Sequence, residues 1–177
     1  MICEKTMPLI KTKKITLLMV LFTLVLLCSS CSGKYQNKRF TFKAPGGVKI
    51  KTLILDGQPK VTLNTGNLYF AITQREIEPG STMQEIYQAY RTQTEGRMHK
   101  YLFISETGVV FHGLPAIEYV YRGFSGEPYV KRRELWFEKG GWVYQLLCSD
   151  PVNVTESPEL PVDEGCYQLA EGFQFRE

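Results

Sequence analysis

The sequence predicts an α+β fold in which a mainly antiparallel sheet is covered by helices. Two observations support this class. Four apolar and aromatic segments follow one another at short intervals in the second half of the chain, and two other segments repeat apolar residues at helical spacing. Strands joined by short connections pair as antiparallel neighbours. The strand candidates are Tyr101–Ser105, Ala116–Arg122, Tyr129–Glu138 and Trp142–Cys148.

Turn signals join these strands and add earlier ones. Apolar and polar residues alternate over 39–43 before a Pro-Gly-Gly break, which predicts an opening edge strand. Segments 61–63 and 68–77 flank a turn-like Asn-Thr-Gly-Asn and predict a hairpin. Gly140 and Gly141 permit the positive φ of a tight turn, so we expect Tyr129–Glu138 and Trp142–Cys148 to be joined in register.

Two helices are predicted to pack on the sheet. Ser81 is the candidate N-cap of the first, with Gln84 three residues later and an apolar stripe of Met83, Ile86, Tyr87 and Tyr90. The second begins near Pro161 and carries the stripe Val162, Cys166, Leu169, Ala170 and Phe173. This stripe has to cover an apolar strand face, which is offered by Trp142, Tyr144, Leu146 and Cys148.

Length and charge limit the classes of function. The chain has 177 residues, enough for one ordinary domain behind a leader. Its net charge of +3 comes from the leader, where four lysines face one glutamate, so the mature chain is neutral. A neutral domain has no broad basic field for a nucleic-acid backbone, and we therefore expect no nucleic-acid partner.

Residues 1–30 have the pattern of a signal peptide. The apolar run Ile15–Leu27 follows a lysine cluster and would form a helix of only about 20 Å. A bilayer core is about 30 Å thick, which favours a cleaved secretory signal over a permanent membrane anchor, the alternative. Met7 is an alternative start to Met1, because the segment that follows it is already basic.

The end of this leader resembles the lipobox of bacterial lipoproteins. It reads LVLLCSSCSGK, in which Ser29 and Ser30 supply the small residues before Cys31. Cys28 follows Leu27 and is a poorer cleavage point; it also stands where the family more often has leucine. The resemblance implies that Cys31 becomes the first mature residue and carries the lipid.

The resulting organisation has three parts: a signal peptide over 1–30, a flexible tether over 31–38 and a folded domain over 39–177. Acyl chains on Cys31 would attach the protein to a membrane without spanning it. We therefore expect a cell-envelope protein whose domain lies outside the cytoplasm.

Two cysteines remain in the exported domain, Cys148 and Cys166. An even number of cysteines outside the cytoplasm favours a disulfide, which would pin the last helix onto the neighbouring strand. Two buried free thiols are the alternative.

Residues from about 40 to 175 resemble the family of the photosystem II extrinsic protein PsbP and its bacterial PsbP-like and DcrB-like relatives. The segments that carry the likeness are FTFKAP, STMQEIYQAY, GLPAIEYVYR, RRELWFEKGGWVYQLL and LAEGFQF, in this order. The resemblance implies an α-β-α sandwich with a central, mainly antiparallel sheet and helices on both faces. It also implies a non-enzymatic accessory, assembly or interaction subunit at a membrane.

Candidate chemistry is sparse. His99 and His112 lie in different segments without a metal-binding spacing, and His112 is expected in a turn. Ser105 and Ser125 are not in a nucleophile elbow. We therefore expect no enzyme activity, no metal and no cofactor. Asn153 begins a glycosylation sequon, which is read as chance behind a bacterial leader.

The one basic triplet is Lys131-Arg132-Arg133. In a strand its members alternate faces, so Lys131 and Arg133 point the same way. They are expected either at a solvated edge or as an interaction surface for an acidic partner or anionic headgroups.

Three functions follow from these observations. The first is a lipid-anchored, non-catalytic subunit that binds a protein or complex in the envelope. The second is a carrier that holds a small apolar ligand between sheet and helix. The third is an envelope hydrolase, which would need Glu118, Glu134 or another carboxylate to converge with His112.

Overall fold

A seven-stranded antiparallel sheet forms the centre of the computed structural model, which describes residues 33–46, 48–55, 57–124, 126–157 and 164–176. Its strand order is β3-β4-β5-β9-β8-β7-β6. The strands are β3 (Lys51–Leu55), β4 (Gln58–Thr65), β5 (Leu68–Glu76), β6 (His99–Phe111), β7 (Leu114–Phe124), β8 (Tyr129–Lys139) and β9 (Trp142–Pro151).

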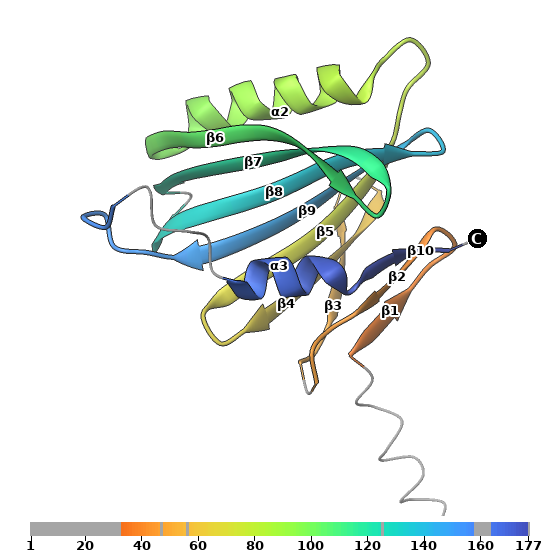
Figure 1. Cartoon of the computed structure of the whole chain (residues 1–177), viewed down its shortest axis with the longest axis horizontal. Coiled ribbons are helices and arrows are strands. Elements are labelled where there is room, and N and C mark those ends of the chain that lie inside the picture. The colour runs from red at the N-terminus through yellow and green to blue at the C-terminus, as the bar shows by residue number, and fades with distance from the viewer. Residues whose placement is uncertain (1–32, 47, 56, 125, 158–163, 177) are drawn as a thin grey trace, which may run out of the picture. The chain divides into compact units, whose positions relative to one another are not determined.

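Each face of this sheet carries its own layer (Figure 1). Helix α2 (Met83–Arg97) lies on one face, and α3 (Glu164–Glu171) lies on the other. A three-stranded sheet of order β1-β2-β10 shares the face of α3; its strands are β1 (Lys34–Gln36), β2 (Phe40–Lys43) and β10 (Phe173–Phe175). The predicted α+β sandwich with a central antiparallel sheet is therefore confirmed.

The alternation of side chains along the strands divides the core into two clusters. The larger cluster lies between the sheet, α3 and the small sheet, and is rich in phenylalanine. The smaller cluster lies beneath α2 and contains Ile86, Tyr87, Met98, Tyr119, Tyr121, Val130, Trp136 and Val143. The sheet therefore has an aromatic, apolar face toward α3 and a tyrosine-rich face toward α2.

The predicted hairpins are present. Strands β4 and β5 pair from Thr65 and Leu68 outward, and β8 and β9 pair from Lys139 and Trp142 outward. The second turn is made by Gly140 and Gly141, both with positive φ. The meander β6–β9 is also as predicted, with longer strands than the sequence indicated.

Two strands differ from the sequence prediction. Residues 34–36 were expected in a flexible tether but form β1, because Tyr35 packs against the core opposite Phe42 of β2. Strand β3 was not predicted, because its five residues are all exposed and show no alternation of apolar and polar side chains.

The helix ends also differ. The N-cap of α2 is Thr82 instead of Ser81: the Thr82 hydroxyl accepts from the Glu85 amide at 3.2 Å, and the Glu85 carboxylate accepts from the Thr82 amide at 2.8 Å. The last helix stops at Glu171, so Phe173 is a buried residue of β10 and not part of the helical stripe. Pro161 and Val162 lie outside the described residues.

Cys148 of β9 and Cys166 of α3 form the predicted disulfide, with their Cα atoms 5.6 Å apart. The bond joins the last helix to the large sheet, as the sequence indicated. No helix in the described part of the chain is long and apolar enough to cross a membrane. The predicted signal peptide and Cys31 lie outside the described residues.

Candidate functional site

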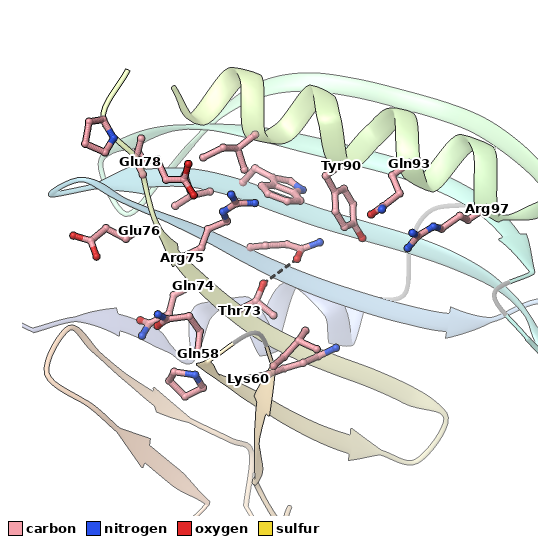
Figure 2. A pocket seen from close by; sticks show the side chains of 18 residues that line it. Gln58, Lys60, Thr73, Gln74, Arg75, Glu76, Glu78, Tyr90, Gln93 and Arg97 are labelled. Atoms are coloured by element: carbon pink, nitrogen blue, oxygen red, sulfur yellow. Dashed lines mark hydrogen bonds between the residues drawn. The ribbon is translucent and has the colours of Figure 1, made fainter. Parts of the chain in front are cut away.

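A groove of about 970 Å³ opens between α2 and the strands β3, β4, β5 and β9 (Figure 2). It exists because α2 covers only part of its sheet face. Tyr87 of the helix bonds to β6 and Tyr90 bonds to β8, whereas β4 and β5 lie beside the helix and not beneath it. The uncovered strands form one wall, and the helix forms the other.

The base of the groove is largely apolar. Trp136 of β8, Val143 of β9 and Ile86 of α2 are each at most 9% exposed and line it from below and from the helix side. Tyr90 packs on Trp136 with ring centroids 4.8 Å apart, and its hydroxyl reaches under the helix. A ligand in the groove would therefore contact these four apolar or aromatic side chains.

Glu134 lies directly behind this base and is fully buried. Its carboxylate accepts four hydrogen bonds, from one tyrosine of α2, one tyrosine of β7, a tryptophan and a glutamine. The donors are Tyr90 Oη (2.9 Å), Tyr121 Oη (2.5 Å), Trp136 Nε1 (2.7 Å) and Gln145 Nε2 (2.9 Å). Gln145 is held in turn by the Thr73 hydroxyl, which donates to its Oε1 at 2.9 Å, as Figure 2 shows.

Burial raises the pKa of Glu134 above its ordinary value, although all four hydrogen bonds act to lower the pKa. Removal from water also raises the pKa of Tyr90 to about 12, with the Glu134 charge acting in the same direction. The four donors leave the carboxylate with no lone pair directed at the groove. Its geometry fits a structural tie between α2 and the sheet and offers no accessible general base.

A second polar cluster fixes the other side of α2. The Tyr87 hydroxyl donates to Glu106 of β6 at 2.7 Å, and Arg91 bridges Glu106 and Glu95. In the same cluster beneath α2, the hydroxyl oxygens of Tyr101 and Tyr119 lie 2.7 Å apart. These contacts fix the helix, so the groove wall is preformed.

Charged side chains of both signs line the mouth of the groove. Figure 2 shows Arg75 near Glu76 and Glu78 at one end, Arg97 on the helix at the other end, and Lys60 on the wall formed by β4. None of the five forms an ion pair with any described residue. They are therefore available to a charged partner.

The predicted basic surface of Lys131 and Arg133 is wrong. The two side chains are only 3% and 8% exposed, because β8 is an inner strand flanked by β7 and β9 on the face of α3. Arg133 pairs with Glu118 at 2.5 Å and stacks on Tyr167 of α3 at 3.9 Å. The guanidinium thus helps to seat the last helix and presents no docking patch.

The residues of the hydrolase hypothesis are not brought together. Glu134 faces α2, whereas His112 lies in the β6–β7 turn and contacts Phe111 and Phe173 of the other face. Glu118 is held by Arg133. His112 is exposed in a turn with φ of 47°, as expected from its sequence position. Among the described residues, no three His, Cys, Asp or Glu side chains gather as a metal site requires.

Sequence reasoning did not find the groove. The signal was present in the register of the meander, where Trp136 lies opposite Gln145 and Glu134 lies beside both on the same face. A charged residue placed between buried aromatic residues on a central strand indicates a hydrogen-bonded polar cluster. The contribution of β4 and β5 depends on the pairing of β5 with β9, which joins residues far apart in the chain.

Comparison with solved structures identifies the fold. The chain is similar to the cyanobacterial PsbP protein CyanoP of Synechocystis sp. PCC 6803, with a TM-score of 0.59 and 13% identity over 83% of this chain and 94% of that one. It is also similar to PA94 of Pseudomonas aeruginosa, a protein of unknown function, with a TM-score of 0.49 and 12% identity over 80% and 94% of the two chains. Neither a family model nor a curated protein matches the sequence. The domain therefore has a PsbP-like fold.

Proposed function

We propose that this protein is a lipid-anchored, non-catalytic subunit of the cell envelope that binds a segment of a partner protein in the groove beside α2. Cys31 carries the lipid, the domain lies outside the cytoplasm, and no cofactor takes part. The PsbP-like fold is compatible with such a role, but fold alone does not define function.

Two features support the location. The lipobox-like end of the leader places a cysteine after two small residues. The Cys148–Cys166 disulfide joins two elements of the core, and disulfides persist mainly in oxidising compartments such as the periplasm.

The observation that carries the proposal is the groove with charges of both signs at its mouth. Its walls are fixed by Glu134 and Glu106, whose hydrogen bonds hold α2, and its base is apolar. An open groove with an apolar base and unpaired charges of both signs at its mouth suits an amphipathic peptide segment, since hot spots of protein interfaces combine a buried aromatic centre with a charged rim.

A small amphipathic ligand is the second candidate. The groove volume lies at the upper end of the range of about 300–1,000 Å³ that is typical of small-molecule sites. The mouth carries charges and glutamines, so the ligand would need polar groups beside its apolar part, in contrast to the purely apolar ligand that the sequence suggested.

Photocrosslinking in intact cells tests the proposal. A photoreactive amino acid replaces Gln93, which is exposed on α2 and lines the groove, or Gln168, which is exposed on α3 on the opposite face. We expect a discrete protein adduct from position 93 and none from position 168. Equal adducts from both positions, or none from either, would contradict binding in the groove.

Two further measurements separate the parts of the proposal. Mass spectrometry of the mature N-terminus must find an acylated Cys31, and Cys31→Ala must release the processed domain from membranes. Native mass spectrometry of the protein extracted from cells must show no bound small molecule; a bound small molecule that is lost on Tyr90→Ala would favour the second candidate.

A further inference from the structure

We propose that the tethered end of the domain docks on anionic phospholipid through three lysines, Lys34, Lys43 and Lys49, which we term the lysine face. This inference rests on the proposed acylation of Cys31. It concerns a different surface from the groove and would make membrane attachment a two-part interaction.

The three lysines are gathered by contacts at the start of the domain. Lys34 and Lys43 lie directly opposite each other in the β1–β2 pair. Gly33 accepts a hydrogen bond from the Ala44 amide at 2.6 Å, and a side chain at Gly33 would lie 3.1 Å from the Val48 carbonyl oxygen. Each lysine is the chain neighbour of one of these residues: Lys34 follows Gly33, Lys43 precedes Ala44 and Lys49 follows Val48. The three lysines therefore lie around Gly33, where the described domain begins.

All three side chains are exposed, because their neighbours in the chain pack against the core instead: Tyr35, Phe42, Val48 and Ile50. None of the three forms an ion pair within the described part of the chain. The sequence from residue 5 to residue 55 contains no aspartate or glutamate. Among the described residues up to 55, the charged side chains are therefore all positive, and an acidic residue close by in the fold is Glu171, next to Gly172, whose carbonyl oxygen accepts from the Lys43 amide.

The facing pair of lysines is unfavourable for folding alone. Like charges placed directly opposite on neighbouring strands destabilise the pair. A sequence that breaks a local rule without compensation in the fold indicates a functional site. An anionic surface beside Lys34 and Lys43 would supply a compensation that no ion pair among the described residues provides.

The tether length brings this surface to the lysine face. Two residue steps separate Cys31 from Gly33, a reach of about 7 Å at full extension. This reach is below the Debye length of about 8 Å at physiological ionic strength, so an acylated Cys31 holds the lysines within the surface potential of the bilayer. Each basic residue at such a surface strengthens binding by about five-fold, and three would give about a hundred-fold.

The acylated full-length mature protein, reconstituted in vesicles, provides the test. Lysine acetylation is followed residue by residue with mass spectrometry on vesicles of phosphatidylcholine alone and of phosphatidylcholine mixed with phosphatidylglycerol. We expect Lys34, Lys43 and Lys49 to be protected on the mixed vesicles only, with the protection lost in high salt. Lys100, exposed at the start of β6, is the internal control and should react equally on both.

Equal reactivity of the three lysines on both vesicles would overturn the proposal. The triple variant Lys34→Gln/Lys43→Gln/Lys49→Gln should remain bound to vesicles through its lipid. When an excess of acceptor vesicles is added, it should leave its original vesicles faster than the control variant Lys100→Gln does. If the purified protein carries no acyl mass, the anchor fails, and sedimentation of that protein with phosphatidylglycerol vesicles tests the lysine face by itself: lysine-dependent binding supports it and absence of binding refutes it.

Discussion

Replacement of Glu134 tests whether the buried carboxylate ties α2 to the sheet. In Glu134→Leu, the nitrogen donors of Trp136 and Gln145 lose the acceptor that each has in the structure. Each buried donor without a partner costs about 1–3 kcal/mol. Removal of a buried carboxyl returns part of this, because burial opposes its ionisation. We expect a net loss of about 2–4 kcal/mol, because two donors without a partner cost about 2–6 kcal/mol together and removal of the buried carboxyl offsets part of that cost.

Urea denaturation followed by circular dichroism at neutral pH measures this loss. With a slope of about 2 kcal/mol per molar, the midpoint of the urea transition should fall by roughly 1–2 M. Glu138→Leu is the matched control, because Glu138 is an exposed residue of the same strand and should change stability by less than about 0.5 kcal/mol. A Glu134→Leu protein as stable as the wild type would refute the reasoning, since the orphaned donors would then cost less than the carboxyl.

The same residue predicts a pH dependence. Its pKa is raised in the folded state relative to the unfolded chain, so the folded state binds the proton more tightly. The associated stability is therefore fully present below the unfolded pKa and is lost as pH rises through the folded pKa. The difference in unfolding free energy between wild type and Glu134→Gln should shrink over that range. A difference that grew with pH would contradict the raised pKa.

Three other substitutions test separate elements by the same denaturation assay. Cys148→Ala, which opens the disulfide to Cys166, should destabilise the oxidised protein by about 2–4 kcal/mol, whereas reduction should leave the variant unchanged. Thr82→Ala should cost about 1 kcal/mol and Ser81→Ala much less; the reverse order would show that the N-cap is misplaced. Gly172→Ala should cost about 1–3 kcal/mol, because its methyl group would overlap a carbonyl oxygen of β2, and a neutral result would contradict that close approach.

The elements that sequence predicted well are those with local signals. The β8–β9 hairpin was identified because Gly140 and Gly141 satisfy the φ of its turn. The first helix was identified from its apolar stripe, but Thr82 and Ser81 are both good N-caps, and only the Glu85 contact selects between them. Strand β3 has no alternation, because both of its faces are exposed, and it carries no periodic signal at all.

Long-range contacts account for what was missed. The burial of Arg133 depends on Tyr167 and Glu118, which reach it from another helix and another strand. A basic triplet therefore resembled a surface although its strand is internal. The groove likewise depends on the pairing of β5 with β9, which the order of the strands along the chain does not reveal.

The placement of β10 has a consequence for how the domain is completed. Strands β1 and β10, which lie at opposite ends of the described chain, both pair with β2, so one edge of β2 stays open until Phe173–Phe175 is in place. Phe173 then stacks on Phe40, with ring centroids 4.9 Å apart. A truncation that removes β10 would therefore leave one edge of β2 unpaired and would remove the ring that stacks on Phe40.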